Sequence, residues 1–280
     1  MKPIYFLSLI IPAILLAYWG ASIVWTPLPL IADPLHLLAL GLGLGAVSAA
    51  VGVPYWRLAL YVNRLEEQIP QAIRTISDAA AAGLGVEDAF RLLAASGLRP
   101  MSDLARQIVG LVEARGLSPD EALMEASSRV PSQAFRRFAS IISYALRSGA
   151  RTQEVLDAAS RSFAAVVQFE KEFSSQLRPY VALFYAFIAM AAAIADILLY
   201  LLAPQLSKLS ITPQPSAVPL TVMPVNVAAA RAVLAYLMAL TSISGGVIVG
   251  KLAYNSPAAG LLHGGLAAAA SVAALVAPGL

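Results

Sequence analysis

Long apolar runs and one long mixed stretch divide the chain. Five runs approach the roughly 20 residues that a helix needs to cross a bilayer. They cover residues 4–25, 35–56, 179–203, 227–249 and 258–280, the last being rich in alanine. This pattern predicts an all-α integral membrane protein with about five transmembrane helices.

The mixed stretch, residues 57–178, shows helical periodicity. Apolar residues recur there at steps of three and four, which places them on one face of a helix. The first such stripe consists of Leu58, Tyr61, Leu65, Ile69, Ile73 and Ile76. Pro70 is expected to kink this helix or to start a new one, because proline lacks a backbone N–H. No stretch alternates with the period of a strand.

Turn and capping signals divide the stretch further. The glycines expected to end helices are Gly83, Gly85, Gly116 and Gly149. Ser118 is followed by Pro119 and by Glu121, which is the pattern of a capping box. Ser132 and Thr152 are the expected caps of the last two helices. The final helix carries an apolar stripe of Val155, Ala159, Val166, Phe169, Phe173 and Leu177. These signals together predict a six-helix bundle inserted between the second and third membrane helices.

Charge supports this division. Charged residues make up only 12% of the chain and hydrophobic residues 59%, so a water-soluble globular fold is excluded. Residues 57–178 hold 15 of the 19 basic and 14 of the 16 acidic residues. The remaining segments are nearly free of charge, as membrane-embedded segments should be.

The few basic residues of the flanks indicate the orientation. Segment 26–34 has no Lys or Arg, and segment 204–226 has only Lys208. The positive-inside rule therefore places the N-terminus and residues 57–178 in the cytoplasm and 204–226 outside. The expected domains are a membrane hairpin (1–56), a cytoplasmic bundle (57–178) and a second membrane region (179–280). Residues 1–22 could alternatively be a cleaved signal peptide, which would leave the downstream orientation unchanged.

The sequence gives little support for a catalytic site. The chain has no cysteine and only two histidines, so no metal site, cofactor or thiolate nucleophile is expected. The run 245–251 begins like a phosphate-binding loop, but Leu252 stands where Ser or Thr is needed. Ser242, Ser244 and His263 would suggest an intramembrane serine protease, yet no flanking glycine turn surrounds the serine. We therefore predict no enzyme.

Three polar residues in apolar runs are candidate functional groups: Asp196, Arg231 and His263. Asp196 and Arg231 are expected at similar depth in antiparallel neighbouring helices, so the sequence predicts that they pair. The alternative is that Arg231 extends to the headgroups while Asp196 binds a backbone or hydroxyl partner. His263 is expected to pack or to form hydrogen bonds.

Three blocks of the mixed stretch resemble a known domain. The run 67–90 combines a proline-containing helix, a glycine and an acidic pair, and 110–123 contains Glu113, Gly116 and Ser118. The third block is 147–150 followed by Val155 and Leu156. Together they resemble the F domain of the type II secretion system. The stretch 250–263 resembles the end of the archaeal branch of that family, which serves archaellum and archaeal pilus assembly.

The resemblance implies a function. Members form the non-catalytic platform of type IV pilus-like filament machines in the cell membrane, without contacting nucleic acid. They couple a cytoplasmic hexameric ATPase to the insertion of pilin subunits. Many members have two helical domains, whereas this chain has one, as in tight-adherence platforms. The resemblance therefore implies a homodimer or a pairing with a second platform chain, in contact with membrane lipid.

Two further expectations concern function. Between residues 129 and 161 six arginines stand against two acids, which predicts a basic surface for an ATPase with an acidic rim. The residues expected to contact the ATPase are Arg136, Arg137, Arg147 and Arg151. The alternatives are a solvated face with local ion pairs and, for the whole chain, a small transporter or channel. Asp196 and Arg231 favour transport, but the chain lacks the internal repeats of transporters.

Overall fold

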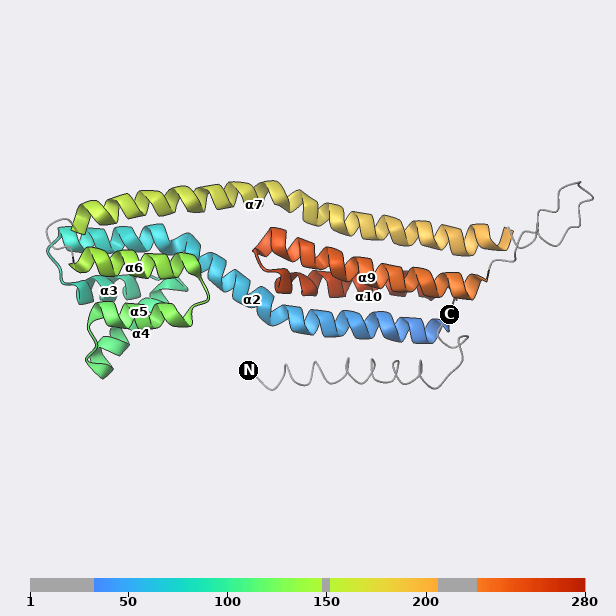
Figure 1. Ribbon diagram of the computed structural model, residues 1–280, viewed down its shortest axis with the longest axis horizontal. Coiled ribbons are helices and arrows are strands. Elements are labelled where there is room, and N and C mark those ends of the chain that lie inside the picture. The colour runs from blue at the N-terminus through green and yellow to red at the C-terminus, as the bar shows by residue number, and fades with distance from the viewer. Residues whose placement is uncertain (1–32, 148–151, 206–225, 280) are drawn as a thin grey trace, which may run out of the picture. The chain divides into compact units, whose positions relative to one another are not determined.

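The computed structural model describes residues 33–147, 152–205 and 226–279 (Figure 1). These residues form helices and connecting turns, without a strand. The α-helices are α2 (Pro34–Ala81), α3 (Val86–Ala95), α4 (Met101–Arg115), α5 (Pro119–Arg129), α6 (Gln133–Arg147), α7 (Thr152–Asp196), α9 (Val227–Tyr254) and α10 (Gly260–Val276). A π-helical segment, Ile197–Leu202, follows α7, and short 3-10 turns, Pro257–Ala259 and Ala277–Gly279, flank α10. The expected all-α class is thus confirmed for the described residues.

Four helices within the described residues are long and apolar enough to cross a membrane. They are α2, α7 with its continuation to Gln205, α9, and the helix Pro257–Val276. The expected spans 35–56, 179–203, 227–249 and 258–280 fall on these four helices. The expected span 4–25 lies outside the described residues, as do Gly149, Arg151 and most of the loop 204–226.

The helices α2 and α7 are longer than their patterns predicted, at 48 and 45 residues. No new helix begins at Pro70, and α7 likewise continues through Pro179. A proline inside a helix removes one backbone hydrogen bond and costs about 3 kcal/mol or more. Around Pro70 the fully buried neighbours Ile69, Ala72 and Ile73 hold both sides of the helix against the bundle and offset that cost.

The chain divides into two compact units. The bundle unit comprises Leu58–Gln176, and the apolar unit comprises Met1–Arg57 and Leu177–Leu280. Both α2 and α7 contribute residues to each unit. Within the bundle unit a single core gathers buried side chains from α2 to α7. The largest are Phe90, Phe135 and Phe138, and the rings of the last two stack with centroids 5.4 Å apart.

Two of the expected apolar stripes are buried only in part. On α2, the residues from Leu65 to Ile76 lie in the core as predicted, but Leu58 and Tyr61 are exposed. On α7, Ala159 is buried, whereas Val166, Phe169 and Phe173 are 51, 66 and 53% exposed. The apolar face of each helix was predicted, and the structure shows that only part of its length is covered. A stripe shows which face of a helix is apolar, but not how far along the helix neighbours cover it.

Turns and caps follow the sequence signals closely. Gly83 and Gly116 have φ of +75° and +63°, the left-handed conformation that glycine adopts without strain. Gly85 has φ −66° and is the N-cap of α3, so it starts a helix instead of ending one. At α5 both halves of the predicted capping box are present, and the Ser118 N–H donates to Glu121 Oε2 at 3.0 Å.

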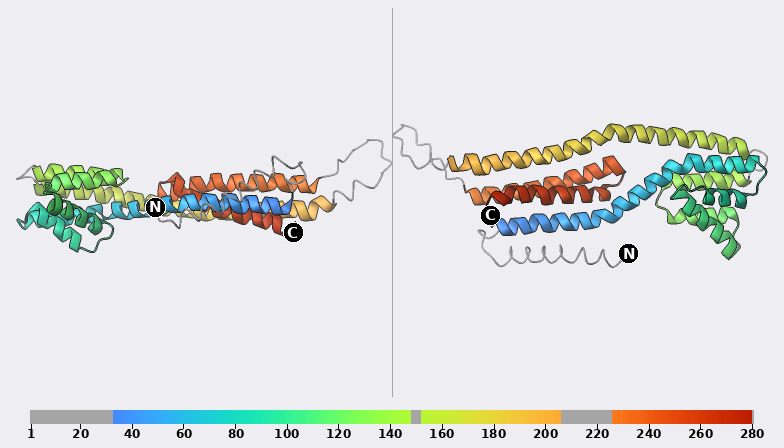
Figure 2. Two further views of the ribbon diagram at one scale, coloured as in Figure 1. Left: turned by 90° about the horizontal axis from the view of Figure 1, so that it is seen from below. Right: turned by 180° about the vertical axis from the view of Figure 1, so that it is seen from behind.

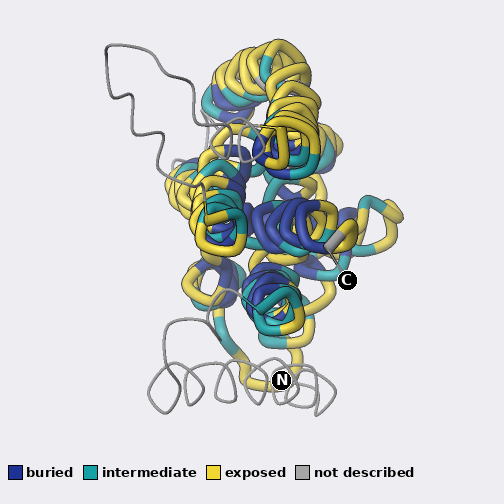
Figure 3. The backbone as a smooth tube through the Cα atoms, turned by 90° about the vertical axis from the view of Figure 1, so that its right-hand side faces the viewer, coloured by how far each residue is buried: buried dark blue, intermediate teal, exposed yellow. Residues whose placement is uncertain are grey.

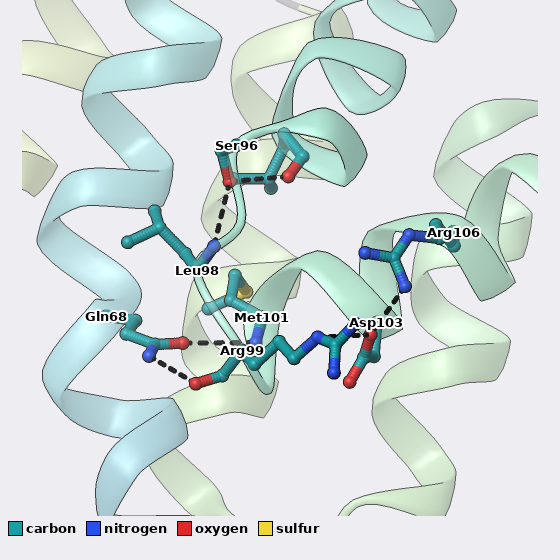
Figure 4. A network of polar contacts seen from close by, with 8 residues as sticks. Gln68, Ser96, Leu98, Arg99, Met101, Asp103 and Arg106 are labelled. Carbon is teal, nitrogen blue, oxygen red and sulfur yellow. Dashed lines mark hydrogen bonds and ion pairs between the residues drawn. The ribbon is translucent and has the colours of Figure 1, made fainter.

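A polar clamp fixes the connection between α3 and α4 (Figure 4). The Gln68 side chain of α2 donates from Nε2 to the Arg99 carbonyl at 2.7 Å and accepts from the Met101 N–H at 3.1 Å. The peptide bond between Arg99 and Pro100 is cis. One amide side chain thus satisfies two backbone groups of the turn that precedes α4.

In the apolar unit, α10 packs against both α2 and α9, and α9 and α10 run side by side (Figures 1 and 2). Glycines permit the close approach. A Cβ atom on Gly52 would lie 2.3 Å from the Leu262 nitrogen, and one on Gly250 would lie 2.2 Å from the Gly260 nitrogen. Buried residues are frequent along α10 (Figure 3). Small residues that let backbones approach are typical of membrane helix packing.

Candidate docking surface and polar groups of the apolar unit

The exposed face of α6 is basic. This helix contains Arg136, Arg137 and Arg147, all exposed, and no acidic residue. Its opposite face is held in the bundle core by Phe135, Phe138 and Ile142, which are at most 1% exposed. The predicted cap is present, because Ser132 Oγ accepts from the Phe135 N–H at 2.9 Å. The same hydroxyl donates to Glu66 of α2, which fixes the start of α6.

The structure brings two of the predicted arginines together and separates the third. Arg136 and Arg137 are consecutive residues near the start of α6, and Arg147 lies in its last turn, about 15 Å away at 1.5 Å per residue. Arg147 Nη2 contacts Asp120 Oδ2 of α5 at 2.5 Å. Arg136 donates to the Val130 carbonyl at 3.3 Å. Among the described residues no ion pair involves Arg137, and Arg151 lies outside them.

Several other arginines of the bundle unit form ion pairs with neighbouring carboxylates. Arg91 contacts both Glu87 and Glu113, while Arg115 and Arg129 share Glu125. These pairs tie α3 to α4 and α4 to α5, although exposed pairs contribute little stability individually. Within the described residues Arg64, Arg74 and Arg161, like Arg137, are exposed and in no ion pair, so the start of α6 is one of several places with unpaired positive charge.

Sequence reasoning missed an aromatic residue on this face. Tyr144 is 66% exposed and lies on α6 two turns after Arg137. On α5, Met124 is 45% exposed. Tyrosine and arginine are the residue types that most often anchor protein interfaces. The sequence contained a signal, because Tyr144 falls between Ile142 and Ala145, which lie on the buried side of the helix.

Asp196 and Arg231 do not form the predicted ion pair. Asp196 Oδ1 and Arg231 Nε are both buried, and neither has a hydrogen-bond partner among the described residues. The guanidinium carbon of Arg231 instead lies 5.8 Å from the ring centroid of Tyr200, within the range of a cation–π contact. Tyr200 lies in the π-helical segment, and its hydroxyl donates to the Leu275 carbonyl at 3.0 Å. Arg231 thus contacts the ring of Tyr200.

His263 forms hydrogen bonds, which was one of its two expected roles. Its Nδ1 lies 2.6 Å from the Tyr185 hydroxyl, and its Nε2 lies 3.2 Å from the Tyr254 hydroxyl. The Tyr254 ring also stacks on the imidazole, with centroids 5.6 Å apart. One histidine on α10 therefore connects α7 and α9.

The remaining candidate motifs have structural roles. The Ser242 hydroxyl lies 3.4 Å from the Ser271 hydroxyl, and the hydrogen bonds of His263 within the described residues join it to Tyr185 and Tyr254 and not to a serine. Residues 245–251 lie inside α9, where a helix replaces the loop that phosphate binding requires. Across the described residues no three potential ligands gather into a metal site.

Comparison with known proteins agrees with the resemblance drawn from the sequence. Residues 72–199 match the family model for the type II secretion system (T2SS), protein F. The match begins within α2, covers α3 to α7 and ends in the π-helical segment. No curated protein and no solved structure matched the chain.

Proposed function

From the match of residues 72–199 to the family model for the type II secretion system (T2SS), protein F, we propose that this chain is a platform protein of a type IV pilus-like assembly machine. It would be a non-catalytic membrane protein that couples a cytoplasmic secretion-type ATPase to the insertion of pilin subunits. Proteins of this family are platform components without catalytic activity of their own. The family match is the observation that carries the proposal.

The proposed topology follows from charge. Residues 57–178 form the cytoplasmic domain, and 204–226 face outside, because the lysines and arginines are concentrated in the first segment. Residues 1–56 and 179–280 form the membrane domain. The four apolar helices among the described residues support a multi-pass protein of the cell membrane. A single helical module per chain calls for a homodimer or a second platform chain.

The exposed face of α6 is the proposed contact for the ATPase. Arg136 and Arg137 present two guanidinium groups at one end of a helix that has no acid of its own. An acidic rim on a partner would be attracted to this end over a distance of about 8 Å at physiological salt. Tyr144 offers an aromatic anchor on the same helix, and Arg147, although paired with Asp120, lies beyond it.

Charge reversal tests this contact. We expect the double variant Arg136→Glu and Arg137→Glu to lose at least tenfold in ATPase co-purification, with wild-type binding weakened by added salt. The matched control is Arg64→Glu with Arg74→Glu on α2, which changes the charge equally at two exposed residues. The control should bind like the wild type. Equal binding by both variants would remove α6 from the interface.

A small transporter or channel is the second candidate. The buried atoms of Asp196 and Arg231 that lack partners favour it, since such groups in membrane helices often mark an ion path. Purified protein in sealed vesicles should then conduct ions, and Asp196→Asn should abolish that flux. A platform protein instead conducts nothing and stands beside genes for a secretion-type ATPase and prepilins.

A further inference from the structure

One arginine of the apolar unit contacts an aromatic ring, although a carboxylate lies about one helical turn from that ring. The guanidinium carbon of Arg231 on α9 is 5.8 Å from the ring centroid of Tyr200. Asp196, the last residue of α7, precedes Tyr200 by four residues, so both lie near one face of the helix, about 6 Å apart along its axis. Asp196 Oδ1 and Arg231 Nε are enclosed by the chain, and neither has a hydrogen-bond partner within the described residues. Buried polar atoms nearly always have partners, so contact with the ring leaves both groups partly unsatisfied.

Two contacts define the register of the neighbouring segments. Phe184 of α7 lies over Gly245 of α9, where a Cβ atom would come within 2.4 Å of the ring. Tyr200, further along the chain, lies beside Arg231, which precedes Gly245 on α9. The two segments are therefore antiparallel neighbours. An axial shift of α7 by one turn toward its C-terminal end would bring Asp196 to the position beside Arg231 that Tyr200 occupies.

Small side chains line the packing between these segments. Ala195 of α7 belongs to one core with Ala232, Ala235 and Ala239 of α9, and all four are buried. Alanine forms low ridges on a helix surface, so it opposes an axial shift less than large interlocked side chains do. Shifts of packed helices by one turn are a recognised transition between two discrete arrangements.

The π-helical segment Ile197–Leu202 begins at the residue after Asp196. Its backbone hydrogen bonds span five residues, whereas those of an α-helix span four. Interconversion of the two bonding patterns therefore rotates the residues on either side of the segment relative to each other. Segments of this kind are rare and occur frequently at functional sites. This segment thus lets the Asp196 side chain turn toward Arg231 as α7 shifts.

We propose that α7 has two registers against α9, which differ by one helical turn and by the partner of Arg231. In the first register, Arg231 contacts the Tyr200 ring, as the structure has it. In the second register, α7 has advanced toward its C-terminal end, and the Asp196 carboxylate pairs with the Arg231 guanidinium. Pairing reduces the cost of holding two charges among membrane helices. Because α7 is one helix from Thr152 to Asp196, an axial force on its part in the bundle unit reaches this contact.

The proposal goes beyond the proposed function, because it follows from contacts within the apolar unit alone. Docking of an ATPase to α6 is neither needed for the two registers nor implied by them. The variant Arg136→Glu with Arg137→Glu should leave the register of α7 unchanged in the purified chain. The docking experiment and the experiments below can therefore fail independently of each other.

Distances between spin labels measure the register in the full-length protein. The chain has no cysteine, so Leu183→Cys on α7 and Val233→Cys on α9 can be labelled specifically, and both positions are exposed. In the second register Leu183 moves one turn toward the level of Val233, so the distance between the labels should shorten by about 4 Å. The matched control carries labels at Leu240→Cys on α9 and Leu266→Cys on α10, which are also exposed. Its distance should stay constant, because α7 is not involved.

Substitutions of the two partners of Arg231 assign the registers. Tyr200→Leu removes the ring that Arg231 contacts in the first register, so the population with the shorter distance should rise at least threefold. Adding Asp196→Asn removes the carboxylate that the second register needs, so the distances should return to those of the wild type. Tyr200→Phe keeps the ring and should stay closer to the wild type than Tyr200→Leu. Distances unaffected by Tyr200→Leu would overturn the proposal, as would a shortening that persists after Asp196→Asn.

Crosslinking in membranes measures the same shift for variants that are too unstable to purify. Phe184→Cys with Gly245→Cys reports the first register, because these two residues face each other. Tyr180→Cys with Gly245→Cys reports the second register, because Tyr180 precedes Phe184 by about one turn. With a short bifunctional thiol reagent, Tyr200→Leu should raise the yield of the second pair relative to the first at least threefold, and Asp196→Asn should cancel that rise. An unchanged ratio of the two yields would overturn the proposal.

Discussion

At the scale of single residues, polar side chains close the turns of the bundle unit. The Ser118 side chain accepts from the N–H of Glu121, and Glu121 in return accepts from the N–H of Ser118. Hydrogen bonding by the Ser118 side chain, and then by Arg147, lowers the pKa of Asp120 below its ordinary value. The same serine lowers the pKa of Glu121. One turn thus joins a helix cap, a charge pair and two acidic groups.

The lowered pKa of Asp120 makes its contribution dependent on pH. A carboxyl whose pKa is lower in the folded state stabilises the fold above its unfolded pKa, about 3.8. That contribution disappears as the pH falls through the lower, folded value. We expect Asp120→Asn to lower the melting temperature at pH 7 and to approach the wild type near pH 3. Melting of the detergent-extracted chain at several pH values measures this, and a constant difference would contradict it.

The hydroxyl of Ser102 is buried and unsatisfied. The residue is 0% exposed, and its Oγ has no hydrogen-bond partner in the part of the chain that the structure describes. Removing an unsatisfied buried hydroxyl should stabilise the fold by about 1 kcal/mol, so Ser102→Ala should raise the melting temperature by a few degrees. The buried Ser127 is the matched control, because its Oγ donates to the Met124 carbonyl at 2.8 Å. A higher melting temperature for Ser127→Ala than for Ser102→Ala would contradict the reasoning.

At the scale of elements, backbone contact at glycines sets the packing of α2, α9 and α10. Positions such as Gly246, Gly250 and Gly264 have no room for a Cβ atom, since backbone atoms of the facing helix lie within 3 Å of where it would be. These contacts are absent from helices of the bundle unit such as α4, where Gly110 faces open space. Helices of the apolar unit therefore approach each other through backbone contact at glycines, whereas Gly110 of the bundle unit makes no such contact.

Substitution of glycine should therefore have opposite effects in the two units. Gly250→Leu should separate α9 from α10 and destabilise the chain by about 2 kcal/mol or more, the upper range for overpacked sites. Gly110→Ala in the exposed interior of α4 should stabilise by about 0.5–1 kcal/mol. Thermal unfolding in detergent measures both. Tolerance of leucine at Gly250 would show that the helices are not in backbone contact.

At the scale of the whole molecule, the proposed topology predicts opposite accessibility for two segments. Ser128 is exposed on α5, and Ser216 lies in the segment proposed to face outside. In this cysteine-free chain, Ser216→Cys should react in intact cells with a membrane-impermeant maleimide, whereas Ser128→Cys should react only after lysis. The reverse pattern would invert the topology and place α6 on the wrong side for an ATPase.

Local signals in the sequence were sufficient for the elements themselves. These signals are the helical periodicity, the capping box at Ser118, the cap at Ser132 and the left-handed glycines. Each depends on residues within one or two turns, so the local sequence is enough to predict it. The apolar spans were predicted for a similar reason, because length and hydropathy decide whether a helix can lie in lipid. The family resemblance added the order of these elements.

Only the tertiary structure decided which groups meet. It shows Phe169 and Phe173 uncovered, Arg147 paired with Asp120, and Arg231 over Tyr200 instead of beside Asp196. Each outcome depends on how helices that are distant in sequence pack together and on their register. Composition and residue spacing within one segment carry no information about that packing. The continuity of α2 through Pro70 has the same origin, since the packing that offsets a lost hydrogen bond comes from other helices.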